Sequence, residues 1–123
     1  MADGLASVFG MNYHEIFPLS RSELEKLIES GNETAITDAL LSAAYYDSDW
    51  RWVQELCLRF MHHADRGIRS NAVICLGHVA RIHKTLDVDV VLPQLAALKA
   101  EDPAIAPWVE DAVEDIRFFL GFQ

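Results

Sequence analysis

The sequence lacks any apolar run of about 20 residues, which is the length that a membrane-spanning helix needs. Its first twenty residues also lack the basic start and continuous apolar segment of a secretory signal. Only two cysteines are present, and neither has the spacing of a metal site or a redox motif. These absences argue against a membrane protein and predict a cytoplasmic one, in which Cys57 and Cys75 are reduced and pack in the core.

Basic residues are also few, since 10 Lys and Arg face 19 Asp and Glu for a net charge of −9. Binding to phosphates depends on accumulated Lys and Arg, so this balance argues against nucleic acid as the main ligand. The charge is uneven: residues 1–47 carry −6, residues 48–84 carry +3 and residues 85–123 carry −6. We expect the bases of the central segment to pair with acids within the protein.

The 123 residues, 51% of them hydrophobic, are typical of one folded domain. Residues 1–19 show no sustained period and are predicted to be an arm that docks by its aromatic side chains. Residues 20–123 are predicted to form a single helical domain, because apolar residues recur there at helical spacing in six segments. The predicted caps and stops are Ser20 or Ser22, Gly31, Asn32, Asp49, Asp65, Asp87 or Asp89, and Gly121. The chain is therefore predicted to be all-α and built from about three antiparallel helical hairpins.

The clearest pattern occupies residues 65–80, which read Asp-x-x-Ile-Arg-x-x-Ala-x-x-x-Leu-Gly-x-Val. Its apolar residues make one helical stripe, and small residues lie where two helices must approach. This arrangement resembles the second helix of a HEAT repeat. The resemblance implies an α-solenoid, in which each hairpin buries one face against the next. A generic α-helical bundle is the alternative, because the first and third units match the layout of helices but not the motif.

The last predicted helix carries the candidate partner-binding surface. Two acidic pairs at i, i+4 are followed by an aromatic residue: Glu110, Asp111, Glu114, Asp115 and Phe118. Like charges at this spacing cost about 0.2–0.5 kcal/mol per pair. An acidic surface that includes an aromatic residue favours docking of a basic protein. The alternative is a solvated face near a helix start, where acids interact favourably with the helix dipole.

A cluster of aromatic residues surrounds the predicted turn between the first two hairpins: Tyr45, Tyr46, Trp50 and Trp52. Large aromatics with acidic neighbours are typical of interface anchors, so Tyr46 and Trp50 are assigned to the partner-binding surface. Trp50 and Trp52 are two positions apart and cannot both face inward, so we expect one of them near the surface. The alternative is that the cluster is mainly structural.

Patterns for catalysis or metal binding are scarce. His62-His63-x-Asp65 looks like a metal site, but adjacent residues on a helix point about 100° apart. HEAT-like iron enzymes use paired His-Glu dipeptides, and His14-Glu15 stands alone in the predicted arm. No Ser or Cys lies in a strained elbow, and no phosphate-binding loop is present. We therefore predict no cofactor, no metal ion and no enzymatic activity.

A small, acidic protein of this design resembles bacterial immunity proteins, which mask a basic toxin domain, often a nuclease, made by the same cell. The resemblance implies a protein partner whose cationic cleft is occupied by acidic and aromatic side chains. Two alternatives stay open: a scaffold or assembly subunit that binds a housekeeping partner, and a small metal-dependent or nucleic-acid enzyme. The sequence makes no prediction of the oligomeric state.

Overall fold

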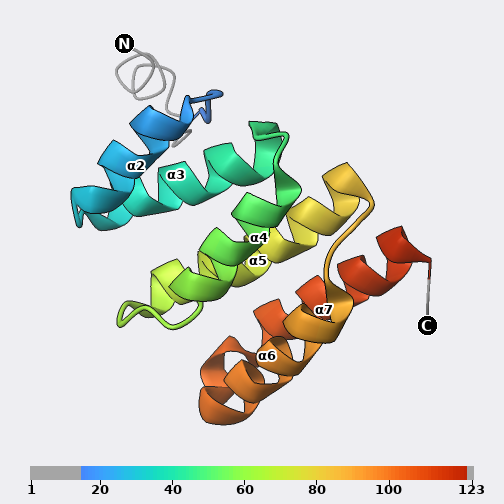
Figure 1. Cartoon of the computed structure of the whole chain (residues 1–123). Coiled ribbons are helices and arrows are strands. Elements are labelled where there is room, and N and C mark those ends of the chain that lie inside the picture. The colour runs from blue at the N-terminus through green and yellow to red at the C-terminus, as the bar shows by residue number, and fades with distance from the viewer. Residues whose placement is uncertain (1–14, 122–123) are drawn as a thin grey trace, which may run out of the picture.

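The structure is a computed structural model that describes residues 15–121 (Figure 1). In this range the chain forms six α-helices, one short 3-10 helix and no strand. The helices are α2 (Arg21–Glu29), α3 (Glu33–Tyr46), α4 (Trp50–Phe60), α5 (Arg66–His83), α6 (Val88–Glu101) and α7 (Ala106–Leu120), with η1 (Pro103–Ile105) before α7. The all-α prediction is confirmed. Most of the predicted arm, residues 1–14, lies outside the described residues, and the domain boundary at residue 20 stays a prediction.

Local capping sets most of the helix starts. In four helices a side chain accepts a hydrogen bond from the backbone N–H three residues on: Ser20, Asn32, Asp49 and Asp65. These caps satisfy backbone donors that have no partner inside the helix. Asp87 also occupies an N-cap position, at the start of α6, but its side chain makes no cap bond and instead accepts from Gln54 Nε2 at 3.0 Å.

The helices pair as α2–α3, α4–α5 and α6–α7, and α5 packs between α3 and α7 (Figure 1). The second helices of the three hairpins thus form one layer, and each first helix lies against its own partner. This order agrees with the predicted hairpins, whereas the assignment to HEAT repeats stays a prediction. No helix within residues 15–121 has the length and apolar character that crossing a membrane requires.

The core is centred on α5. The apolar stripe predicted for this helix is buried throughout: Ile68, Ala72, Cys75, Leu76 and Val79. Cys57 of α4 is also buried, and both cysteines are free thiols, as predicted. Small residues allow α5 and α7 to approach closely, because a Cβ built on Gly77 would lie 3.7 Å from Ala112 Cα.

Ion pairs join the second hairpin to the third. Asp102 Oδ2 lies 2.8 Å from Arg69 Nη2 and 3.2 Å from Arg66 Nε. Arg51 of α4 similarly approaches Asp87 at 3.6 Å. Three bases of the positively charged central segment therefore pair with acids of the C-terminal segment, as the charge distribution led us to expect.

Candidate partner-binding site

Helix α7 presents its acids on two flanks. Successive residues advance by about 100° around a helix. Glu110 and Glu114 therefore lie on the flank toward α6, and Asp111 and Asp115 lie on the flank toward α5. Phe118 projects between the flanks and is 76% exposed. All five of these predicted partner-binding residues are exposed, so α7 brings them together on one accessible surface.

The flank toward α6 contains bases as well as acids. Lys99 Nζ of α6 lies 2.9 Å from Glu110 Oε2. Both residues, together with Glu114 and Arg117, line an open groove of about 1040 Å³ between α6 and α7. Its apolar lining includes Leu92, Ala96, Val109 and Val113. This flank is therefore not uniformly acidic, because Lys99 and Arg117 lie beside the two glutamates.

The flank toward α5 is acidic. Asp111 and Asp115 are exposed, and neither forms an ion pair within residues 15–121. Asp115 lies over α5, since its Oδ2 is 3.1 Å from the position that a Cβ on Gly77 would occupy. This flank therefore has the unpaired carboxylates that a basic partner needs.

His78 of α5 lies beside this acidic flank and is half-buried. Its Nδ1 is 3.2 Å from Arg81 Nη2, and its ring packs edge-on against Tyr45 with the centroids 5.0 Å apart. Burial lowers the pKa of His78, Arg81 lowers it further, and Asp115 acts in the opposite direction. A neutral imidazole is thus favoured next to the acidic flank.

Tyr46, at the end of α3, is 51% exposed. Its hydroxyl donates a hydrogen bond to the Ile16 carbonyl at 3.3 Å, and Ser42 Oγ donates to the Phe17 carbonyl at 2.7 Å. These bonds fasten residues 16 and 17 to α3. Tyr46 therefore combines an accessible ring with a structural contact to the segment that precedes α2.

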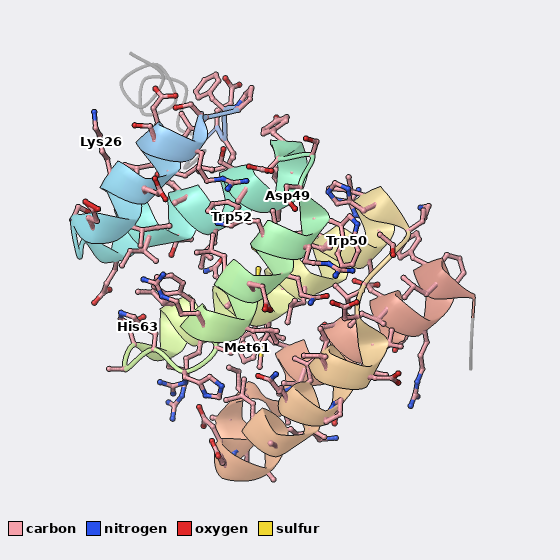
Figure 2. The ribbon with its side chains drawn as sticks, in the orientation of Figure 1. Lys26, Asp49, Trp50, Trp52, Met61 and His63 are labelled. Atoms are coloured by element: carbon pink, nitrogen blue, oxygen red, sulfur yellow. The ribbon has the colours of Figure 1, made fainter. Side chains whose placement is uncertain are left out.

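Trp50 and Trp52 lie on opposite sides of α4 (Figure 2). Both side chains are half-buried against the core. The Arg51 guanidinium lies 4.8 Å from the Trp50 ring centroid, and that of Arg21 lies 3.6 Å from the Trp52 centroid. The two indoles differ less in exposure than expected, because a cationic side chain covers each ring.

The predicted site residues form two groups. The five on α7 share one helix, while Tyr46 and Trp50 lie at the junction of α3 and α4, with α5 packed between α3 and α7. The carboxyl ends of α3, α5 and α7 lie at the same end of the molecule (Figure 1). A single large partner would therefore have to extend across α5 to touch both groups.

The two bases of the groove, Lys99 and Arg117, are not among the site residues predicted from the sequence. Arg117 follows Glu114 by three residues, and the helical i, i+3 rule would have placed them near each other. Lys99 belongs to a different helix from Glu110, so only the packing of α6 on α7 reveals their ion pair.

The His62-His63-x-Asp65 pattern serves local structure. His63 Nδ1 accepts a hydrogen bond from the backbone N–H of Asp65 at 3.0 Å, and the Asp65 carboxylate caps α5. In the part of the chain that the structure describes, no three His, Cys, Asp or Glu side chains gather as metal ligands would.

Comparison with protein-family models and with curated proteins gives no match. A solved structure does match: a chain in the crystal structure of a CDI complex from Cupriavidus taiwanensis LMG 19424 is 38% identical, with a TM-score of 0.77. The match covers 89% of this chain and 97% of that chain. This chain therefore belongs to the same protein family as that component of the contact-dependent inhibition (CDI) complex.

Proposed function

We propose that the chain is an immunity protein that binds a basic toxin domain and blocks its active cleft. The observation that carries this proposal is its 38% identity to a component of a CDI complex, over 97% of that component. Immunity proteins of contact-dependent inhibition are inhibitors rather than enzymes. In this role the chain has no catalytic activity of its own and acts in the cytoplasm, where it meets the toxin.

The acidic flank of α7 supports a basic partner. Many other acids are used inside the protein, as caps or in ion pairs with arginines: Asp47, Asp49, Asp65, Asp87 and Asp102. Asp111 and Asp115 are not used in this way within residues 15–121, so their charges face outward. A nuclease is the toxin class that fits such a surface best, because a cleft that binds phosphates is lined by Lys and Arg.

Phe118 is the proposed apolar anchor between the two flanks. Burying a phenylalanine side chain contributes about 1.5–3 kcal/mol, and Phe118 is 76% exposed before any partner binds. Charge on the two aspartates would speed the encounter, and burial of Phe118 would slow release. Glu110 and Glu114 are proposed as further contacts beside Phe118. Tyr46 and Trp50 are proposed as a second, smaller contact at the junction of α3 and α4.

The first experiment identifies the partner. The tagged full-length protein is used to capture proteins from its native cells at low and high salt, and mass spectrometry identifies those that are retained. The partner domain is then purified, and its activity is measured with increasing amounts of the tagged protein that captured it. We expect one basic polypeptide whose activity is blocked at a stoichiometric ratio.

The second experiment tests the surface with matched variants. Asp111→Asn with Asp115→Asn removes two charges from α7, and Glu25→Gln with Glu29→Gln removes two charges at the same spacing from the exposed side of α2. We expect the α7 variant to bind the toxin domain about tenfold more weakly at low salt, mainly through slower association. The α2 variant is expected to bind like the wild type, and surface plasmon resonance at two salt concentrations measures both.

Different outcomes contradict different parts of the proposal. Capture of several weakly held acidic or neutral proteins would contradict the immunity function and favour a scaffold. Capture and inhibition of a basic toxin, with equal affinity for both double variants, would support the function but reject the acidic flank as its binding surface.

A further inference from the structure

The groove between α6 and α7 leaves an apolar surface open to solvent. α6 packs on α7 and η1, and no other described element makes comparable contact with it. Leu92 and Val113 in the groove are only partly buried, and Ala96 is exposed. Phe118 lines the same groove and is the most exposed large apolar side chain in residues 15–121. A concave apolar surface with a charged rim is typical of a protein interaction site.

The charge of the rim indicates what kind of partner fits. The groove is lined by two acids, Glu110 and Glu114, and by two bases, Lys99 and Arg117. This local sum of zero contrasts with the net charge of −9 for the whole chain. A cationic cleft is matched by an acidic surface, whereas this rim matches a partner that carries both signs. A second copy of the chain has such a surface, and its approach at a locally neutral rim meets the least repulsion.

Two-fold symmetry would bring an acid of the rim in one copy opposite a base of the rim in the other. Lys99 is already paired with Glu110, but Glu114 and Arg117 form no ion pair within the described range. When two copies of one helix pack antiparallel about a two-fold axis, each residue of one helix lies opposite a particular residue of the other. The numbers of the two residues in each such pair add up to the same value, which is fixed by the position of the axis. An axis between Asp115 and Ile116 therefore sets Glu114 of each copy level with Arg117 of the other.

We propose that the groove between α6 and α7 seats α7 of a second copy, so that the protein forms a two-fold symmetric dimer with reciprocal Glu114–Arg117 ion pairs. The apolar floor of each groove is then covered, and the most exposed phenylalanine is drawn toward an apolar surface. Both copies use the same patch, which makes the interface closed and limits assembly to two chains.

The dimer overlaps the proposed toxin-binding surface, because Glu110, Glu114 and Phe118 belong to both. Toxin and second copy would exclude each other, and the inhibited complex would form from monomers. This consequence depends on the proposed function, whereas the dimer itself does not.

The test is a charge swap measured by sedimentation equilibrium of the full chain over a wide concentration range. The wild type is expected to show a monomer–dimer equilibrium. Glu114→Arg and Arg117→Glu each bring like charges together across the axis and are expected to weaken the dimer at least about tenfold. The variant with both substitutions restores opposite charges and is expected to return to within about threefold of the wild-type dimerisation constant.

The matched control is Asp111→Arg, which makes the same charge change on the flank of α7 outside the groove. It is expected to leave the dimerisation constant unchanged, and circular dichroism checks that every variant is folded. A wild type that is monomeric at all concentrations would overturn the proposal, as would a dimer that survives both single reversals. No toxin enters this experiment, so its failure leaves the immunity function standing, and failed toxin capture leaves the dimer standing.

Discussion

The acids of α7 differ in their surroundings although the sequence spaces them alike. Glu110 pairs with Lys99, and Asp115 lies beside α5. Asp111 and Glu114 extend from the surface without an ion pair among the described residues. Glu110→Lys therefore removes the attraction to Lys99 and sets two lysine ammonium groups close together. The relief of repulsion that the sequence alone predicts for this position is not expected.

His78 reports on the charge of Asp115. Burial is the main reason that the pKa of His78 is lowered, the neighbouring Arg81 lowers it further, and Asp115 raises it. Because the folded pKa lies below the unfolded value of about 6.5, the unfolded chain binds a proton more readily. With His78 neutral, its contribution to stability is present above the pKa of the unfolded chain. That contribution is lost as the pH falls through the pKa of His78 in the folded chain.

We therefore predict that Asp115→Asn lowers the pKa of His78 further. The measurement is an NMR titration of the imidazole protons in the wild type and the variant. Asp111→Asn is the control, since Asp111 is not among the charges that shift the pKa of His78. A raised or unchanged pKa in the Asp115 variant would contradict the arrangement of α5 and α7 described above.

At the scale of elements, the contact of α5 with α7 depends on small side chains. A Cβ added at Gly77 would lie 3.1 Å from Asp115 Oδ2 and 3.7 Å from Ala112 Cα. The carboxylate is the end of an exposed side chain and can rotate away, whereas the backbone of α7 cannot move without repacking the core. The position therefore has room for one methyl group and little more.

We predict that Gly77→Ala changes the free energy of unfolding by no more than about 1 kcal/mol, because the gain in helix propensity offsets the crowding. Gly77→Leu is expected to destabilise the protein by about 1–3 kcal/mol through overpacking. Urea unfolding followed by circular dichroism measures both. Ala97→Leu, at an exposed position of α6, is the control. Wild-type stability of Gly77→Leu would show that the two helices do not cross closely at this residue.

At the scale of the whole molecule, arginines of the second hairpin hold the turn before η1. Asp102 in that turn accepts hydrogen bonds from Arg66 and Arg69. Arg69 Nη1 also donates to the carbonyls of His63 and Ala64, at 2.8 and 2.9 Å. The Arg69 guanidinium therefore connects the turn before α5 to the turn after α6. Bases of the positive central segment and an acid of the negative C-terminal segment thus link the second hairpin to the third.

This link predicts how stability depends on pH. Arg69 and then Arg66 hold the pKa of Asp102 below its ordinary value. The resulting stabilisation is present above the unfolded pKa of about 3.9 and is lost as the pH falls through the lower, folded pKa. We predict that Asp102→Asn lowers the urea midpoint at pH 7 and that the difference from the wild type narrows below pH 3.9.

The control for this prediction is Glu101→Gln, because Glu101 is exposed and forms no ion pair in the described part of the chain. Its midpoint is expected to stay close to that of the wild type across the same range. A difference between Asp102→Asn and the wild type that stays constant down to the lowest pH would show that the ion pairs contribute nothing.

The sequence by itself determined the helices and their starts. Ser20, Asn32 and Asp65 cap the helices that they were predicted to cap, and the apolar stripe of α5 is buried. Capping and helical periodicity depend on residues within about four positions of one another, so a sequence displays them directly. The helical periodicity of residues 65–80 likewise predicted an all-α fold, whereas the protein-binding role stays a proposal.

Only the tertiary structure decided how the candidate site is divided. It paired Glu110 with Lys99, placed Asp115 against α5, and covered both tryptophans with arginines. It also separated the α3–α4 aromatics from α7 by inserting α5 between α3 and α7. Except for Arg51 on its neighbour Trp50, these contacts join residues on different helices. Their geometry depends on how the hairpins pack, which no local pattern in the sequence specifies.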